Sequence, residues 1–188
     1  GLTQLATAIV DMTTTTGYRP KNIVDLLNVV RHLYSERLVS VDATSIVSDR
    51  EKFRAFQNYW NHRALGPDFI ELNREFIRKH PTRLRRIFFC DSLIGAVREK
   101  WFKDSALDQA KLGAQIKIVE IGSLKALTEI KDIGLYVHEE DGHIAGKYVL
   151  IAPEATFDEP NLLDTRLVAE NRTVQGNELA FRRMWDGC

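Results

Sequence analysis

Cysteine is scarce in this chain, and so are long apolar segments and any excess of charge. Only two cysteines occur in 188 residues, Cys90 and Cys188, which excludes a disulfide-stabilised scaffold and favours a reducing compartment, so we expect a cytoplasmic protein. No apolar run approaches the roughly 20 residues that a membrane-spanning helix requires. Lysine plus arginine and aspartate plus glutamate both number 26, so the zero formal net charge provides no overall attraction to nucleic acid or acidic lipid.

Recognised ligand spacings for metals and cofactors are also missing. The densest group of metal-type side chains is the segment 138–143, which is rich in carboxylates and imidazoles. Its spacing matches no known metal motif, and the Asp-Gly pair inside it is typical of a hairpin turn, so we expect a solvated turn without a metal. Cys90 follows two phenylalanines and is expected to be a buried, unreactive thiol. The sequence therefore predicts no metal and no cofactor.

The second half of the chain contains short apolar runs separated by turns and helical patterns. The runs occupy residues 85–90, 116–121, 132–137 and 147–152. A helical stretch joins the first two, which predicts parallel pairing, whereas the turn at Asp141-Gly142 predicts a hairpin between the last two. Residues 165–169 are expected to form an edge strand before a final helix. Residues 82–188 are therefore predicted to form an α/β domain with a mixed (parallel plus antiparallel) sheet of four to six strands flanked by helices.

The first part of the chain, residues 1–80, is predicted to be a helical N-terminal region. Asn22 is a suitable N-cap for one helix, another is expected to begin near Ser48, and a third follows Pro67. Residues 36–47 fit either a short strand or a loop. Because the chain opens on a glycine, an origin as part of a longer protein stays open.

The order of elements in residues 82–188 resembles one half of a phospholipase D-like domain. The resemblance rests on a strand, a long helix, the strand GAQIKIVEI, the hairpin strands DIGLYV and KYVLIAP, and a closing helix that ends NELAFRRMW. The active family has the motif His-x-Lys-x-x-x-x-Asp, in which histidine is the nucleophile and lysine binds phosphate. Here Asp132, Gly134 and Glu139 occupy these three positions. The resemblance implies the fold without the phosphodiesterase activity, as in many bacterial regulatory proteins that use this half-domain.

A degenerate half-domain of this kind implies a non-catalytic module for regulation, ligand sensing or oligomerisation. The complete family brings two halves together around one site, so a lone half implies a homodimer that uses the same patch on both subunits. Ligands of open α/β sheets bind where the strands end, and Asp91, Ser92 and Glu120 are expected there. His143 and Lys147 complete the candidates for binding a small polar or anionic molecule. The competing interpretations are that Asp91 or Ser92 simply caps the helix and that Glu120 is a solvated acid at the end of its strand.

Two other functions fit particular residues. A hydrolase or phosphodiesterase would use a constellation of Asp91, Glu120 and His143, since two close carboxylates raise the pKa of one of them. A nucleic-acid-binding module would use the basic segment 78–86 to contact phosphates. The cations of that segment are Arg78, Lys79, Arg83, Arg85 and Arg86. No nucleic-acid-binding motif accompanies them and acidic neighbours can neutralise them, so nucleic acid is the least favoured partner.

Overall fold

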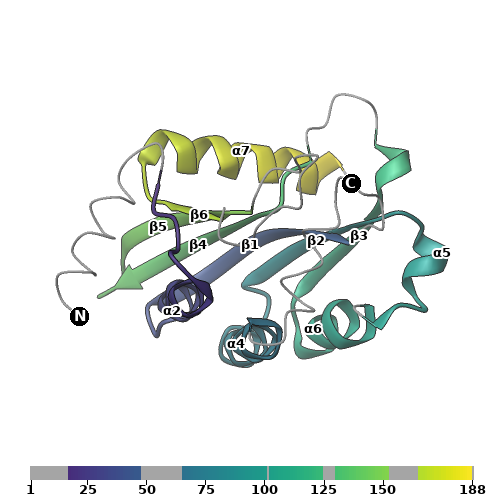
Figure 1. Ribbon diagram of the computed structural model, residues 1–188, viewed down its shortest axis with the longest axis horizontal. Coiled ribbons are helices and arrows are strands. Elements are labelled where there is room, and N and C mark those ends of the chain that lie inside the picture. Colours follow the sequence, from purple (N-terminus) through teal and green to yellow (C-terminus); the bar gives the residue numbers. More distant parts are fainter. Residues whose placement is uncertain (1–16, 48–64, 101, 125–129, 153–164, 188) are drawn as a thin grey trace.

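The chain folds into one six-stranded mixed sheet with helices on both faces (Figure 1). The structure is a computed structural model that describes residues 17–47, 65–100, 102–124, 130–152 and 165–187. The strands are β1 (Leu38–Val47), β2 (Leu84–Cys90), β3 (Gln115–Glu120), β4 (Ile133–Glu140), β5 (His143–Ile151) and β6 (Arg166–Val168). Their order is β3-β2-β1-β4-β5-β6; β1, β2 and β3 are parallel, and β4, β5 and β6 continue the sheet in antiparallel pairs. This architecture confirms the predicted fold class.

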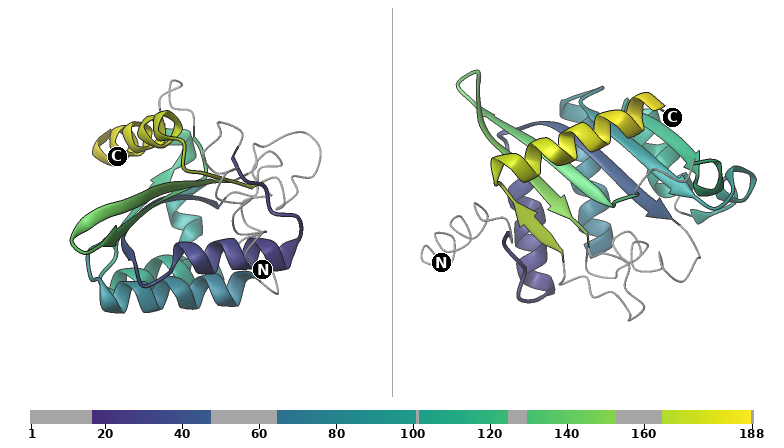
Figure 2. Two further views of the ribbon diagram at one scale, coloured as in Figure 1. Left: turned by 90° about the vertical axis from the view of Figure 1, so that its left-hand side faces the viewer. Right: turned by 90° about the horizontal axis from the view of Figure 1, so that it is seen from above.

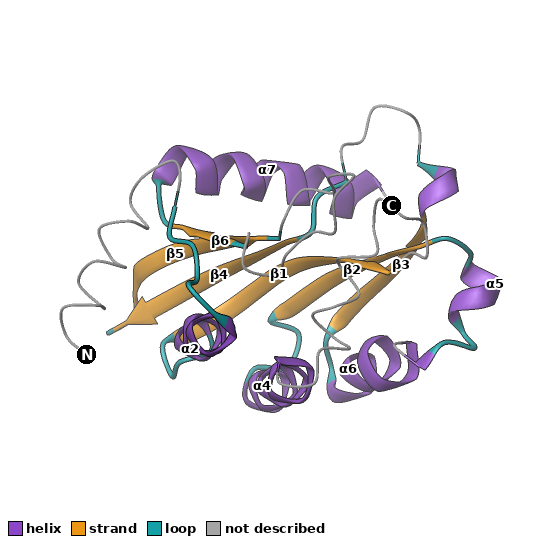
Figure 3. Cartoon of the chain, in the orientation of Figure 1, coloured by secondary structure: helices purple, strands orange, loops and turns teal. Residues whose placement is uncertain are grey.

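The helices form a layer on each side of this sheet (Figure 2). One layer contains α2 (Ile23–Leu33), α4 (Leu65–Lys79) and α6 (Asp108–Leu112), and the other contains α7 (Asn171–Gly187). Short turns of helix lead from β2 toward α6 and follow β3, namely α5 (Leu93–Ala96), η2 (Phe102–Leu107) and η3 (Ile121–Ser123). Figure 3 shows α7 crossing the face of the sheet opposite α2, α4 and α6. Among the described helices, none combines the length and the hydropathy that crossing a bilayer requires.

The centre of the sheet comes from the part of the chain that was expected to be helical. β1 lies between β2 and β4, so that Val41 pairs with Leu84 on one side and with Tyr136 on the other. Residues 38–47, which fitted a strand or a loop, are therefore a strand. α2 and α4 fall within the expected helical region, whereas the helix expected near Ser48 lies outside the described residues.

Polar residues interrupt the apolar pattern of β1 in the sequence, and in the structure they have hydrogen-bond partners. Asp42 accepts two hydrogen bonds from Arg85 of β2, at 2.7 and 2.5 Å. The hydroxyl of Thr44 accepts a hydrogen bond from the amide of Ile133 at 2.9 Å and donates to the carbonyl of Lys131. Since polar groups that leave water must be hydrogen-bonded, these contacts let a polar strand occupy the middle of a sheet.

Several element boundaries follow from local chemistry. The side chain of Asn22 accepts a hydrogen bond from the amide of Asp25 at 2.9 Å and caps α2, as predicted. Gly113 ends α6 with a φ of 110°, a value that glycine adopts without strain. Asp141 and Gly142 both have positive φ and join β4 to β5, which confirms the predicted hairpin.

Each helical layer covers its own apolar core. Successive residues of β2 point to opposite faces, so Phe88 belongs to the core under α4 while Phe89 belongs to the core under α7. Phe181 is the central α7 side chain of the second core and is fully buried. This two-sided burial of β2 was predicted, and so were the parallel pairing of β2 with β3 and the edge position of β6.

Candidate functional site

The parallel strands end at a common edge of the sheet, where several predicted site residues lie. Val47 of β1 pairs with Cys90 of β2, which pairs with Glu120 of β3, and Asp91 follows directly. Burial raises the pKa of the Cys90 thiol, and the negative charges of Glu120 and Asp91 raise it further. This thiol is 2% exposed, so it is protonated and inert at neutral pH, as predicted. We call this region the carboxyl edge.

Ser92 at the carboxyl edge acts as a helix cap. Its hydroxyl accepts a hydrogen bond from the amide of Gly95 at 3.3 Å and begins α5, which has only four residues. The interpretation of Ser92 as a cap is therefore the one that the geometry supports.

The structure separates His143 and Lys147 from the carboxyl edge. β1 pairs Leu38, near its beginning, with His138, and the hairpin turn follows at Glu140. The hairpin turn therefore lies at the opposite edge of the sheet, roughly 25 Å away along the eight-residue β4 at about 3.3 Å per residue. The constellation of Asp91, Glu120 and His143 that a hydrolase would need is not assembled. The prediction of this constellation failed because the sequence did not reveal that β4 runs antiparallel to β1.

Asp132 is a site residue at the carboxyl edge that sequence reasoning did not select. It precedes β4 and accepts a hydrogen bond from the amide of Ile46 at 3.3 Å. Loss of solvent raises its pKa to about 7, although that hydrogen bond and the positive charge of Arg86 act in the opposite direction. Asp132 and Arg86 line a cavity of about 40 Å³ together with Ser45 and Phe69, a volume that holds only a few water molecules.

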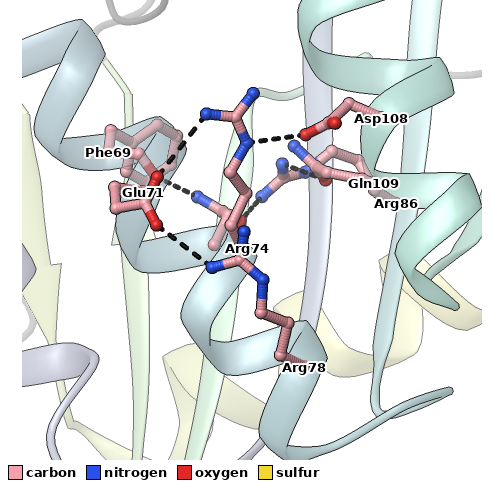
Figure 4. Close-up of polar contacts among 8 residues, drawn as sticks. Phe69, Glu71, Arg74, Arg78, Arg86, Asp108 and Gln109 are labelled. Carbon is pink, nitrogen blue, oxygen red and sulfur yellow. Dashed lines mark hydrogen bonds and ion pairs between the residues drawn. The ribbon is translucent and has the colours of Figure 1, made fainter.

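Arg86, from the basic segment, points into the core and joins the sheet to two helices (Figure 4). Its guanidinium donates to Oε1 of Gln109 in α6 at 2.8 Å and to Oδ1 of Asn73 in α4 at 2.9 Å. Tyr34 also donates to Oδ1 of Asn73, at 2.9 Å. Since Arg86 is 1% exposed, it is a structural cross-link and presents no charge to an outside phosphate.

The remaining cations of the basic segment are dispersed. Arg85 points to the other face of the sheet, where it binds Asp42 and lies over the rings of Phe181 and Trp185 in α7. Arg78 forms an exposed ion pair with Glu71 at 3.1 Å. Figure 4 shows this pair beside the ion pair that Glu71 forms with Arg74. The five cations are neighbours in sequence without sharing one structural setting: Arg78 and Lys79 end α4, Arg83 precedes β2, and Arg85 and Arg86 point to opposite faces of β2 because consecutive strand residues alternate.

A larger groove lies at the opposite edge, near the hairpin. It has a volume of about 780 Å³ and is bounded by the end of α2, the loop before β1, β4, β5 and the residue after β6. We call it the hairpin groove; its lining residues are His32, Ser35, Glu36, Arg37, His138, Ala145, Gly146, Lys147, Tyr148 and Ala169. Of the candidates chosen from sequence, only Lys147 is among them.

The polar side chains of the hairpin groove have defined partners. Arg37 binds Glu140 at 2.8 Å, and Lys147 binds Glu178 of α7 at 2.7 Å. Nε2 of His138 lies 2.8 Å from the carbonyl of Leu33, which can only accept, so Nε2 carries the proton. Burial lowers the pKa of His138 and outweighs the hydrogen bond to Leu33, which acts in the opposite direction; the nearby charges of His32 and Arg37 lower this pKa further, so the ring is neutral at pH 7.

Within the part of the chain that the structure describes, no cluster of three or more histidine, cysteine, aspartate or glutamate side chains is arranged to hold a metal ion. Neither comparison with known sequences adds a family: no protein-family model matches the chain, and no curated protein matches it. The site must therefore be interpreted from its own geometry.

Proposed function

We propose that this protein is a non-catalytic regulatory or ligand-sensing module built on a degenerate phospholipase D-like half-domain. The order of elements supports the proposal, since β2, the helical crossover, β3, the β4–β5 hairpin and α7 follow one another as the resemblance implies. The same resemblance aligns Asp132, Gly134 and Glu139 with the histidine, lysine and aspartate of the active family.

The strongest support for this proposal comes from the surroundings of Gly134. A Cβ atom at this position would lie 2.8 Å from both Cε2 and Oη of Tyr136, which is closer than carbon and ring atoms tolerate. Tyr136 is 2% exposed and packs edge-to-face on Tyr34, with ring centroids 5.6 Å apart. A lysine at position 134, like any residue with a Cβ atom, would have to displace this buried ring, which supports a site without the phosphate-binding side chain.

Asp132, which stands where the active family has its histidine nucleophile, supports the same conclusion. Asp132 is held by the amide of Ile46, and the cavity beside it is too small for a phosphodiester. With a pKa of about 7 this carboxyl is substantially protonated at neutral pH, which makes it a weak nucleophile.

A turnover assay tests the proposal directly. The purified chain is incubated with bis(4-nitrophenyl) phosphate and with a short single-stranded oligonucleotide, beside the variants Asp132→Asn and Asp141→Asn. Asp141 lies in the exposed hairpin turn, so it controls for the loss of one carboxylate. We expect the same background rate from all three proteins. Turnover that disappears in Asp132→Asn and persists in Asp141→Asn would refute a non-catalytic role.

Homodimerisation is the second part of the proposal, and the mass of the native particle tests it. The chain has a mass of 21.5 kDa and no net charge, so electrostatic self-repulsion opposes association only weakly. Light scattering coupled to size exclusion should give twice the chain mass across a dilution series. A particle that keeps the mass of a single chain at all concentrations would exclude the dimer.

A further inference from the structure

We propose that the carboxyl group of Asp132 is a proton-sensitive latch between β1 and β4 at the carboxyl edge. In its neutral form the group joins the diverging ends of the two strands, and in its ionised form it turns out into water and releases them. This inference deepens the proposed regulatory function by naming its input, the proton, and it rests on that function only for its biological use.

The backbone pairing of β1 with β4 ends before β1 does. The last paired residues are Ala43 and Gly134, whereas β1 continues to Val47 and stays paired with β2 on its other side. Beyond the last pair, the amide of Ile133 in β4 donates to a side chain, the hydroxyl of Thr44, at 2.9 Å. Side chains therefore join the two strands where the backbone ladder has stopped.

Asp132 supplies a second bridge of this kind. Its Oδ2 accepts a hydrogen bond from the amide of Ile46 in β1 at 3.3 Å, just beyond the usual range of about 2.7 to 3.2 Å, so the bond is weak. The backbone carbonyl of Asp132 accepts from the amide of Ala152 at 3.0 Å, which fixes its main chain to the residue after β5. The side chain can therefore turn away from Ile46 by rotation about its own bonds while the backbone stays in place.

The cavity beside Asp132 offers little to stabilise a negative charge. Its volume of about 40 Å³ holds only a few water molecules. Among the described residues that line it, the other groups that carry charge or titrate are Arg86 and Tyr136. The guanidinium of Arg86 is already engaged by the amide oxygens of Asn73 and Gln109. Asp132 itself keeps partial solvent access, so bulk water is within reach of the carboxylate that ionisation creates.

Ionisation therefore favours the outward position of the side chain. In the inward position, loss of solvent opposes the charged form more than the amide of Ile46 and the charge of Arg86 favour it, so the pKa of Asp132 is raised from 3.8 to about 7. In the outward position the group is hydrated and its pKa returns toward 3.8. The ratio of outward to inward population consequently grows as pH rises between these two values, by roughly tenfold or more from pH 5 to pH 8.

Nuclear magnetic resonance of the full chain tests the latch at the amide of Ile46. From pH 5 to pH 8 we expect its proton signal to move upfield with the midpoint of the Asp132 carboxyl titration, because the hydrogen bond is lost. Its exchange with solvent, corrected for the intrinsic rate, should accelerate roughly tenfold or more. Ionisation without release would instead move the signal downfield, since a hydrogen bond to a charged group is stronger. A downfield or absent shift, or a constant corrected exchange rate, would overturn the proposal.

Two carboxylate variants complete the test. Asp132→Asn cannot ionise, so the amide of Ile46 should no longer respond to pH in this range. Glu170→Gln is the matched control, because Glu170 also accepts hydrogen bonds from backbone amides, those of Arg172 and Thr173 at 2.9 and 2.7 Å. The hydroxyl of Thr173 and these amides lower the pKa of Glu170, so it stays ionised throughout, and its variant should leave the response of Ile46 unchanged.

A response of Ile46 that survives in Asp132→Asn, or that disappears in Glu170→Gln, would contradict the latch. Phosphodiester turnover by the natural chain would instead refute the non-catalytic function and leave the response of Ile46 unaffected. The two proposals can therefore fail separately.

Discussion

Arg86 is the side chain whose burial demands most from its neighbours. Removing a guanidinium from water costs several kcal/mol unless its donors find good acceptors. Two amide oxygens, of Asn73 and Gln109, receive its hydrogen bonds, and the rings of Phe69 and Phe88 lie 5.9 Å from its central carbon. The arginine therefore connects β2, α4 and α6 at one point, and the amides that hold it are committed to this role.

Replacing Arg86 with methionine tests the cross-link. The variant keeps the length and apolar character of the stem but leaves two buried amide oxygens with fewer donors, so we expect a loss of about 2 to 4 kcal/mol in the free energy of unfolding. Arg83→Met, three residues earlier and exposed, should change it by less than about 0.5 kcal/mol. Urea unfolding at constant pH measures both values. Equal effects from the two variants would contradict the cross-link.

Asp132 should make stability depend on pH. Its pKa is raised to about 7 in the folded state from 3.8, so the folded chain binds the proton more tightly than the unfolded chain. The contribution is full below pH 3.8 and is lost as pH rises through about 7. Because the side chain keeps partial solvent access, we expect a loss of about 2 to 4 kcal/mol across this window.

The variant Asp132→Asn isolates this dependence. Asparagine can still accept from the amide of Ile46 but does not ionise, so the difference in stability between the variant and the natural chain should grow in favour of the variant between pH 5 and pH 8. Urea midpoints at several pH values give this difference. A difference that stays constant with pH would show that the carboxyl has an ordinary pKa.

Sequence reasoning identified single residues well where the cause is local. The cap at Asn22, the turn at Asp141-Gly142 and the buried thiol of Cys90 were all predicted, because each depends on a few adjacent residues. Arg86 was assigned to a basic surface segment, since a charge is usually solvated. Its position two residues before Phe88, on the inward face of a buried strand, was the available signal that it points into the core.

Glycine followed two residues later by tyrosine occurs in both strands of the β4–β5 hairpin. Tyr136 covers Gly134, and Tyr148 covers Gly146. In each strand the tyrosine ring lies over the glycine backbone. The ring shields the backbone hydrogen bonds between the strands and fills the space that a side chain at the glycine would occupy. This device explains why the hairpin tolerates two residues that otherwise weaken strands.

The same substitution at two glycines should have opposite effects. Gly134→Ala places a methyl group against the ring of Tyr136 and should cost about 1 to 3 kcal/mol through overpacking. Gly176→Ala lies on the exposed side of α7, where a Cβ atom meets nothing within 4 Å, and should gain about 0.5 to 1 kcal/mol from helix propensity. Thermal unfolding of both variants measures the signs. A neutral Gly134→Ala would mean that Tyr136 is free to move aside.

Elements were predictable when their apolar pattern was clean and became ambiguous when it was not. β2 has a continuous apolar run, β3 and the hairpin have short or alternating apolar runs bounded by turn signals, and all were placed correctly. β1 contains Asp42, Thr44 and Ser45, whose partners lie at least 43 residues away, so no local pattern could separate a strand from a loop. The hairpin groove depends on the same long-range pairing, because it forms where β4 meets the end of α2.

The sheet as a whole should show graded protection of its amides. β1 is paired on both sides and β2 is buried on both faces, whereas β3 and β6 are the outermost strands among the described residues. We expect amide hydrogen exchange to be slowest in β1 and β2 and distinctly faster in β3; Leu167 of β6 should be protected by its backbone hydrogen bond to Tyr18. Mass-spectrometric exchange on the native chain gives this order. Protection of β3 equal to that of β1 would indicate that another segment or subunit covers its outer edge.

The central position of β1 constrains how the chain can be divided and how it forms. A fragment beginning at residue 82 would contain β2 and β3 as one pair and β4 to β6 as another group, with no strand to join them. During synthesis, the central strand β1 leaves the ribosome before any of the strands that pair with it. Its partners on one side, β2 and β3, and those on the other, the hairpin and β6, are all synthesised after it, so β1 is available for pairing before either half of the sheet is complete.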